Sequence, residues 1–412
     1  MSEPPGNVGA PRSRDSLVNA GDVRLGYCTN VHAGHDLDST LANLKRHAST
    51  VRESLGLAGR LDIGLWLSAG AVDAAAGRVL ELRQALRDSG LRAFSFNGFP
   101  YGDFHEPVVK HAVYEPNWAD PRRVRYTLDL IAVLGGLLGE HDQGSISTVP
   151  VGWPGTPCAP VDPERAAMNL RYVADVLART RQETGQLIHL DLEPEPGCIL
   201  STSDDVIAFW KRHLLVGGAG AEGPVREHLR VCHDVCHAAV MFEDQAQVLN
   251  TYSAAGIQVG KVQISSAPRI ELAGGAQDRA AMHALESFAE ARYLHQTCVR
   301  SGRSGQADPG APDFHEDLPA ALSALRGRSA PGEARVHFHV PIFMDSIGPL
   351  GTTQDHIEPA IRAALASGVN HFEVETYAWN VFPPALAGDV DLAAGIAREM
   401  RFAAGLINWL LR

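Results

Sequence analysis

Short apolar segments alternate along the chain with longer segments whose apolar residues recur at helical spacing. The strand-like segments cover residues 24–31, 62–68, 92–98, 145–152, 187–193, 229–235, 261–267, 335–343 and 371–377. The helical patterns cover residues 38–55, 71–89, 120–139, 163–184, 203–214, 243–255, 280–298, 355–367 and 386–411. This strict alternation predicts an α/β fold with a parallel sheet inside and helices outside, and eight such units close a (β/α)8 TIM barrel.

Nine strand-like segments are one more than the barrel needs. We assign residues 335–343 to an extended segment after the seventh strand, and residues 371–377 to the eighth strand. Long insertions are expected after strands 3 and 7, at about 99–119 and 268–343, and long ordered loops tend to carry function. Residues 1–20 are polar and rich in Pro, Gly and Ser, which predicts a disordered arm without a signal peptide. Residues 21–412 are expected to form the barrel, without a second domain.

Length, charge and cysteine usage narrow the class of protein. A chain of 412 residues with 45% apolar residues has the material for one large barrel with insertions. A net charge of −12 argues against sequence-independent binding to nucleic acid, which needs clustered Lys and Arg. No apolar run is long enough to be a transmembrane segment. The six cysteines are scattered, which predicts a reducing compartment and a cytoplasmic location.

Polar residues with metal-ligand or proton-transfer chemistry gather at the predicted strand ends, where TIM barrels carry their active sites. They are Asn30 and His32 after strand 1, Asn97 at strand 3, Glu193 at strand 5, Asp234 and His237 at strand 6, Gln263 in strand 7, His337 and His339 in the extra segment, and Glu373 and Glu375 in strand 8. Side chains alternate along a strand, so His189, Asp191 and Glu193 share one face, which we take to point into the barrel. Singly, such residues are surface groups, helix caps or core histidines. Their placement at successive strand ends predicts a shared polar site.

The run "CHDVCH" at residues 232–237 resembles a c-type haem attachment motif or half of a zinc site. The haem motif has two residues between its cysteines, whereas three residues separate Cys232 from Cys236. The chain has no second cysteine pair at zinc-finger spacing. We therefore interpret both cysteines as small buried residues.

Two of these motifs carry a resemblance to a known group of proteins. "EPEP" at the end of strand 5 and D-x-x-H at the end of strand 6 resemble the xylose isomerase-like TIM barrels, which include sugar isomerases, epimerases and the endonuclease IV nucleases. The resemblance implies that Glu193, Asp234, the position of Gln263 and Glu375 bind a divalent metal. It also implies that His237 sits beside the metal or the substrate.

A closer resemblance covers nearly the whole chain. "LGYCTNVHAG", "FNGFPYGDFHEPVVKHAVYEPNW", "HLDLEPEPG", "CHDVCHAAV", "KVQISSA" and "HFEVETYAW" are similar to the metabolite traffic protein EboE family. That family is associated with an operon that also encodes a prenyltransferase-like and a dehydroquinate synthase-like protein. The resemblance implies the same barrel fold, a metabolite ligand and other proteins of the operon as partners. The family's name describes metabolite export and defines no reaction.

Two departures from the isomerase pattern bear on the chemistry. Gln263 stands where the isomerases have a histidine, which leaves an oxygen-rich site that favours Mg²⁺ or Mn²⁺ over Zn²⁺. His337 or His339 could restore a nitrogen ligand. Glu195 stands where the metal-using xylose isomerases have the lysine of E-P-K-P, and loss of that cation argues against a hydride shift.

The sequence thus favours a divalent-metal-dependent isomerase or epimerase of a sugar- or cyclitol-like hydroxyketone. We expect Glu193 and Glu375 to exchange the proton, because a metal bound to neighbouring oxygens makes the intervening C–H acidic. The expected metal ligands are Glu193, Asp234, Gln263, Glu375 and His339, and the expected substrate-binding residues are His32, Asn97, Tyr101, Lys110, Tyr114, Glu195, His237 and His337. Two alternatives remain open: a non-catalytic barrel that binds a polyol or prenyl-linked metabolite, and a metal-dependent hydrolase of the endonuclease IV type.

Overall fold

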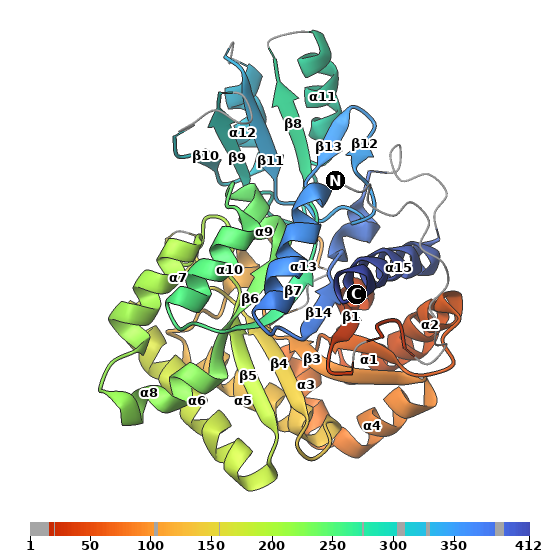
Figure 1. Ribbon diagram of the computed structural model, residues 1–412, viewed down its shortest axis with the longest axis vertical. Helices are drawn as coiled ribbons and strands as arrows, with labels where there is room; N and C mark the ends of the chain where they lie inside the picture. Colours follow the sequence, from red (N-terminus) through yellow and green to blue (C-terminus); the bar gives the residue numbers. More distant parts are fainter. Residues whose placement is uncertain are drawn as a thin grey trace.

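Eight parallel strands close a barrel in a computed structural model of the chain, which confirms the predicted TIM barrel (Figure 1). The structure describes residues 16–19, 21–102, 106–155, 157–273, 276–302, 310–326, 330–383 and 391–412. The barrel strands are β1 (Arg24–Cys28), β2 (Leu61–Leu65), β3 (Leu91–Asn97), β4 (Gln143–Thr148), β5 (Leu187–Leu192), β6 (Leu229–Asp234), β7 (Val259–Ile264) and β14 (His371–Val374). β14 pairs with both β7 and β1, so residues 371–374 form the eighth strand, as the sequence predicted.

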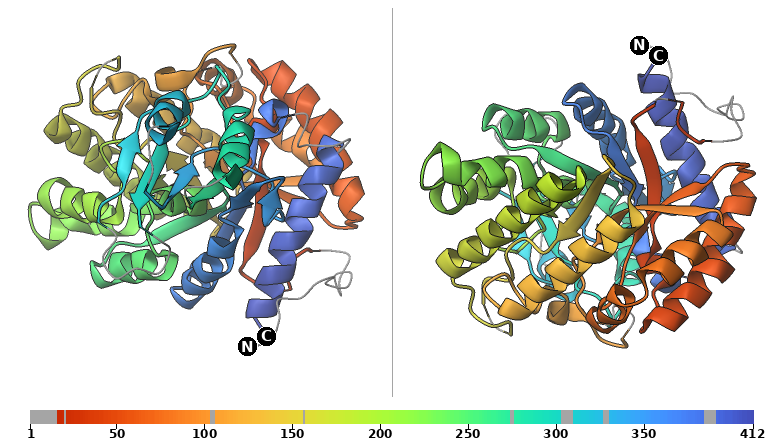
Figure 2. Two further views of the ribbon diagram at one scale, coloured as in Figure 1. Left: turned by 90° about the horizontal axis from the view of Figure 1, so that it is seen from above. Right: turned by 90° about the horizontal axis from the view of Figure 1, so that it is seen from below.

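Helices surround the barrel and bury their apolar faces against it (Figure 2). They are α1 (Leu37–Asn43), α2 (Ser49–Leu55), α3 (Ala69–Ala76), α4 (Val79–Asp88), α5 (Pro121–Leu137), α6 (Pro163–Thr184), α7 (Ser203–Phe209), α8 (Ala219–His228), α9 (Val235–Val240), α10 (Gln245–Ala254), α13 (Ile357–Ala366) and α15 (Leu392–Leu410). Short 3₁₀ or π-helical turns lie between them: η1 (Thr29–His32), η2 (Leu44–Ala48), η3 (Lys110–Tyr114), η4 (Trp210–Leu214), η5 (Gln354–His356) and η6 (Tyr377–Val381). Asp120 and Asp162 cap α5 and α6 before a proline at the first helical position, a typical start signal.

The interior of the barrel is polar, although branched apolar residues usually fill it. Lys261 of β7 forms an ion pair with Glu373 of β14, and Asp191 of β5 accepts a 2.5 Å hydrogen bond from Ser145 of β4. Gly64 makes room for the first pair, because a Cβ there would lie 2.4 Å from a Glu373 carboxylate oxygen. The alternation in strand 5 therefore predicted its inward face correctly.

The insertion after β7 builds a second, six-stranded antiparallel sheet in the order β10-β9-β11-β8-β13-β12. It contains β8 (Pro268–Leu272), α11 (Ala276–Glu286), β9 (Thr297–Ser301), β10 (Asp313–His315), α12 (Leu318–Arg326), β11 (Gly332–Val336), β12 (Ser346–Ile347) and β13 (Leu350–Thr352). A separate apolar cluster fills it, including Phe288, Leu322 and Phe338, and it also contacts Trp66 and Val109 from the barrel loops. Seen from above, the insertion covers the centre of the barrel (Figure 2).

Two details differ from the sequence expectation, and part of a third prediction lies outside the described residues. The helix expected at residues 280–298 ends at Glu286, and residues 297–301 form β9 instead, because Phe288, Leu294 and Val299 pack into apolar clusters as parts of a turn and a strand. Most of the arm expected at residues 1–20 lies outside the described residues, but Leu17 and Val18 are buried in the core. The start of the helix expected at 386–411 also lies outside them.

No helix in the described ranges combines the length and apolar character needed to cross a membrane.

Candidate metal centre

Three carboxylates meet at the C-terminal mouth of the barrel. Glu193 follows β5, Asp234 ends β6 and Glu375 follows β14, and one oxygen from each lies within 4.8 Å of the others. We call these three residues the carboxylate cluster. All three side chains are buried. Like charges at this distance repel strongly away from water, so the cluster needs protons or a cation to be stable.

The strands and their exits hold each carboxylate in place. The Glu193 N–H donates to the Thr148 carbonyl (3.0 Å), which extends the β4–β5 ladder by one residue before Pro194 ends it. Asp234 caps α9, since its Oδ1 accepts from the His237 N–H (2.9 Å) and the Ser265 hydroxyl (2.7 Å). D-x-x-H is therefore partly a helix-capping motif.

Amide side chains orient the two glutamates. Gln263 Nε2 donates to Glu193 Oε2 at 2.8 Å. Asn97 Nδ2 and Asn30 Nδ2 donate to Glu375 Oε1 at 2.9 and 3.1 Å. Within the described residues, Glu193 Oε1 and Glu375 Oε2 take no hydrogen bond, so each carboxylate keeps one oxygen available.

The donor set fits a divalent cation. Asp234 Oδ2, Gln263 Oε1 and His339 Nε2 are buried and have no hydrogen-bond partner among the described residues. His339 Nδ1 donates to the Glu375 carbonyl at 2.6 Å, so Nε2 carries the lone pair, and it lies 3.9 Å from Asp234 Oδ2. Unsatisfied buried oxygens and a bare imidazole nitrogen are what a metal site offers.

The three carboxyl groups of the cluster differ in pKa because their surroundings differ. Burial raises the pKa of Glu193 to about 7, against the opposing charges of His237 and Lys261. Burial and the neighbouring carboxylates raise the pKa of Glu375 well above its usual range. Burial also acts on Asp234, but His237, His339 and two hydrogen bonds outweigh it and lower that pKa. Asp234 is therefore the ionised member, while both glutamates can carry a proton near neutral pH.

A second group of ionisable residues lies beside the first. Glu195, His237 and His337 also bring one ligand atom each within 4.8 Å of one another, and we call them the outer cluster. His237 Nε2 lies 3.0 Å from His337 Nε2 and 3.9 Å from Asp234 Oδ1. Burial lowers the pKa of His237, but the surrounding carboxylates outweigh it and raise that pKa; burial lowers the pKa of His337 well below its usual range.

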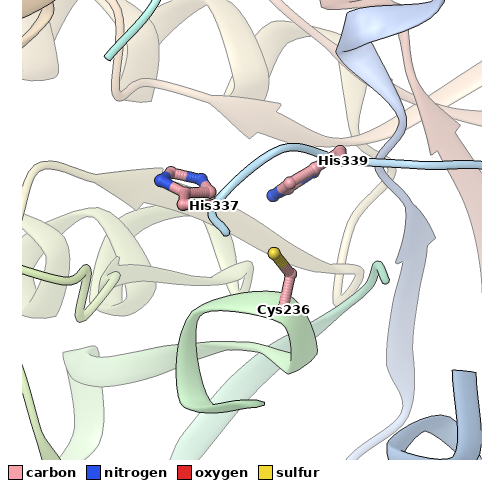
Figure 3. Close-up of side chains that lie close together, drawn as sticks. All are labelled: Cys236, His337 and His339. Carbon is pink, nitrogen blue, oxygen red and sulfur yellow. The ribbon is translucent and has the colours of Figure 1, made fainter. Parts of the chain in front are cut away.

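The insertion places His337 and His339 at the barrel mouth. The His337 N–H donates to the Gln296 carbonyl (2.8 Å), which continues the pairing of β11 with β9, and the Val340 N–H donates to the Ser266 carbonyl (2.9 Å) at the exit of β7. Figure 3 shows the two imidazoles on one extended segment, with the Cys236 thiol of α9 facing the space between them. Cys232 and Cys236 are buried free thiols, and Cys236 lies within ligand distance of both histidines.

A small cavity opens onto both clusters. Its volume is about 60 Å³, which is room for roughly four to six water molecules. The third-loop residues Phe99, Val109, Lys110, Val113 and Tyr114 line one side, and Tyr293, Leu294 and Tyr377 line another. Lys110 Nζ lies 2.5 Å from Asp317 Oδ2, so its charge is already paired.

The structure brings most of the expected site residues together. Asn97, Lys110, Tyr114, Glu193, Glu195, His237, His337, His339 and Glu375 line the cavity, and Asp234 and Gln263 contact residues that do. His32 and Tyr101 are not among the lining residues. His32 stacks on His47 (4.9 Å between ring centroids), and Tyr101 packs edge-on against Tyr126 (5.2 Å). His32 lies one turn beyond the end of β1, and Tyr101 lies in the third loop, the segment that suggested it, but turned toward Tyr126.

Sequence reasoning left out four contributors to the site. Asn30 was noted at the end of strand 1 but was not included among the expected site residues, and Tyr377, two residues after Glu375, was not considered. Gln296 and Tyr293 lie in a segment expected to be helical. No local pattern marks them, because only the folded insertion places them at the barrel mouth.

Comparisons with known proteins place the fold. No known protein family matches the chain, and no curated protein sequence matches it. Among solved structures, it is similar to a xylose isomerase-like TIM barrel protein from Mycobacterium smegmatis in complex with magnesium, at 14% identity and a TM-score of 0.52, covering 95% of this chain and 98% of that one.

Two further structures are similar at lower scores. An L-ribulose 3-epimerase is 15% identical with a TM-score of 0.47, covering 94% of this chain and 95% of its own. A xylose isomerase domain protein from Alicyclobacillus acidocaldarius subsp. acidocaldarius is 14% identical with a TM-score of 0.44, covering 94% and 99%. Identities this low establish the fold alone, which is a TIM barrel similar to that of the Mycobacterium smegmatis protein.

Proposed function

We propose that the protein is a divalent-metal-dependent isomerase or epimerase of an uncharged hydroxyketone. One observation carries this proposal: three buried carboxylates with ligand atoms within 4.8 Å face the unsatisfied His339 Nε2 and Gln263 Oε1 at the barrel mouth. Glu193, Asp234, Glu375 and His339 would hold the metal, with Gln263 through its amide oxygen. The oxygen-rich set favours Mg²⁺ or Mn²⁺, and the similar Mycobacterium smegmatis protein was crystallised with magnesium.

The two glutamates supply the proton transfer. A bound divalent cation would polarise the carbonyl oxygen and stabilise negative charge there. Glu193 accepts a hydrogen bond from Gln263 through Oε2, which leaves Oε1 facing the cavity side of the site for proton exchange. Glu375 is held by Asn97 and Asn30 through one oxygen, which leaves the other for the same exchange. One carboxylate would take the proton from carbon and the other would return it.

The cavity wall favours an uncharged substrate. Among the described residues that line the cavity, Lys110 is the only lysine or arginine, and its ammonium is paired with Asp317. A phosphate or carboxylate group held away from the metal would therefore find no free ammonium or guanidinium to neutralise it. Apolar residues of the third loop and the insertion can cover the C–H face of a small polyol.

Incubation of the metal-loaded protein in D2O with unphosphorylated ketoses and ketocyclitols tests this function. We expect deuterium at the carbon next to the carbonyl together with an epimer or isomer, and loss of both in Glu193→Gln and Glu375→Gln. Asp129→Asn, on the outer face of α5, serves as the matched control. Binding without exchange or turnover would instead support the metabolite-binding alternative. The EboE-like role in metabolite traffic, prenyl-linked ligands, operon partners and a cytoplasmic location stay predictions from the sequence.

A further inference from the structure

Five arginines line one cavity at the end of the barrel opposite the carboxylate cluster, the end that Figure 2 shows from below. Arg24 begins β1, Arg60 precedes β2, and Arg92 lies at the start of β3, whereas Arg83 and Arg87 come from α4. We call these five residues the arginine cluster. The cavity has a volume of about 370 Å³, which is enough for a small ligand. A neighbouring cavity of about 420 Å³ shares the three arginines that come from the strand ends.

Too few carboxylates face the arginine cluster to neutralise it. Arg92 Nη2 donates to Asp62 Oδ2 at 2.7 Å, and Arg24 Nη2 lies 3.7 Å from Asp142 Oδ1. Asp142 is the only acidic residue among the described residues that line the cavity. The side chains of the other three arginines have no hydrogen bond or ion pair with any residue that the structure describes. Three positive charges are therefore left unbalanced in a chain whose net charge is −12.

The acidic residues of α4 do not neutralise its two arginines. Glu81 pairs with Arg78 at 2.7 Å, and Asp88 accepts a hydrogen bond from Gln84 Nε2 at 2.7 Å. The two arginines of the cluster lie four residues apart on this helix, and like charges at that spacing destabilise a helix. A bound anion would remove this repulsion.

Positive charge also acts on the barrel interior at this end. His371 of β14 pairs in register with Arg24 of β1, and neither of its buried ring nitrogens has a hydrogen-bond partner among the described residues. Burial lowers the pKa of His371 well below its usual range, and the charges of Arg24, Arg230 and Lys261 act in the same direction. An anion bound at this end of the barrel would offset these charges.

We propose that the arginine cluster binds the diphosphate group of a small organic molecule. Guanidinium groups donate paired hydrogen bonds to phosphate oxygens, and several of them suit a ligand with several negative charges. Leu86, Leu91 and Phe94 form an apolar part of the same cavity, where the organic part of the ligand can pack. The site lies at the other end of the barrel from the proposed active site, and it does not depend on the proposed function.

Two other occupants fit the charges less well. Residues 1–15 carry Glu3 and Asp15 but also Arg12 and Arg14, so this segment brings no net negative charge. Nucleic acid needs basic residues spread over a wide surface, which a chain with a net charge of −12 opposes. A small anion needs only the local excess of arginine.

Isothermal titration calorimetry of the full-length protein tests the proposal, with inorganic pyrophosphate and ADP as probes. Chelator is kept in the buffer, so that no metal ion joins the phosphates to the carboxylate cluster. We expect both probes to bind once per chain with a Kd below about 100 µM at low salt. ADP should bind at least as tightly as pyrophosphate, whereas adenosine, which lacks the phosphates, should not bind.

Two variants locate the bound anion. Arg60→Gln and Arg83→Gln should each weaken the binding of both probes roughly tenfold, because each removes a guanidinium that has no partner among the described residues. Arg165→Gln is the matched control, since Arg165 is an exposed arginine on the first turn of α6. It should bind both probes as the wild type does. Circular dichroism confirms that each variant is folded.

Failure of both probes to bind the wild type would overturn the proposal. Equal affinities of the wild type, Arg60→Gln and Arg83→Gln would do the same, because the anion would then lie elsewhere. Binding of pyrophosphate without binding of ADP would overturn the assignment to an organic ligand. Tighter binding of a single-stranded RNA than of ADP would overturn the assignment to a small molecule.

Discussion

Lys261 Nζ lies 3.2 Å from Glu373 Oε2 in the middle of the barrel, and neither side chain is exposed. Burial would lower the pKa of Lys261, but the Glu373 carboxylate outweighs it and raises that pKa, so the ammonium stays charged. Glu373 lies two residues before Glu375, so both side chains lie on the inward face. The positive charge of Lys261 also acts on Glu193 and Glu375 and lowers their pKa values. It therefore supports the carboxylate cluster from beneath.

Removing one partner of this pair should be costly. Lys261→Met leaves a buried, unpaired carboxylate, which we expect to lower the free energy of unfolding by about 3–5 kcal/mol. Urea denaturation followed by circular dichroism measures the change. The double variant Lys261→Met/Glu373→Gln should recover much of the loss, since no charge is then buried alone. Equal losses in the single and double variants would show that packing, and not charge, dominates.

The barrel could be predicted because its signals are local. The spacing of apolar residues predicts each strand and the helix that follows it. Glu193, Asp234 and Glu375 lie at strand ends, which any TIM barrel brings together. Inward parity also follows from alternation in "LIHLDLE". Neither inference required knowledge of contacts distant in sequence.

The remaining half of the site depends on the insertion, whose contacts are long-range. His337 and His339 reach the barrel mouth because β11 pairs with β9 and with β8, and the sequence does not encode that register locally. Gln296 lies in a stretch with a helical pattern that tertiary packing overrides. The ion pair of Lys110 could not be predicted from the sequence either, because its partner Asp317 lies 207 positions away.

Glu399 of α15 gives the fold a pH dependence. It accepts hydrogen bonds from the Ile342 N–H, the Thr376 hydroxyl and Trp379 Nε1, and so fixes the chain after Glu375. Burial raises its pKa from 4.5 to about 7. Because the folded pKa is the higher one, this contribution to stability is complete below pH 4.5 and is lost as the pH rises through 7.

Unfolding free energies of the wild type and Glu399→Gln between about pH 5 and about pH 8 check this dependence. The wild type should lose roughly 3 kcal/mol more than the variant across that range. The two proteins are compared by how steeply the free energy of unfolding changes with pH. The Gln side chain changes the contact with the Trp379 N–H, and this shifts the free energy of unfolding by the same amount at every pH. Parallel slopes for the two proteins would mean that Glu399 is ionised throughout.

Asp317 controls the charge that Lys110 presents to the cavity. In Asp317→Asn the side-chain oxygen can still accept from the His295 and Leu318 N–H groups, but the ion pair with Lys110 is lost. We expect the ratio of kcat/KM for phosphorylated over unphosphorylated ketoses to rise roughly tenfold, about 1.4 kcal/mol for a partly exposed pair. Steady-state kinetics on matched ketose pairs measures it.

Asp355→Asn is the control for this change, because it removes a carboxylate that pairs with Arg269 on the outer side of the insertion. It should leave the ratio unchanged. If Asp317→Asn also leaves it unchanged, Lys110 does not reach the substrate and the cavity excludes anions for another reason.

The Mn²⁺ affinity of Glu193→Gln tests the central claim most directly, since the proposed chemistry needs a metal at the carboxylate cluster. Chelator-treated wild type and variant are titrated with Mn²⁺, with free ion followed by electron paramagnetic resonance and folding checked by circular dichroism. We expect the variant to bind at the cluster roughly a hundredfold more weakly than the wild type, while Asp129→Asn binds as the wild type does. Unchanged Mn²⁺ affinity in a folded Glu193→Gln protein would contradict the assignment of Glu193, Asp234 and Glu375 as a metal site.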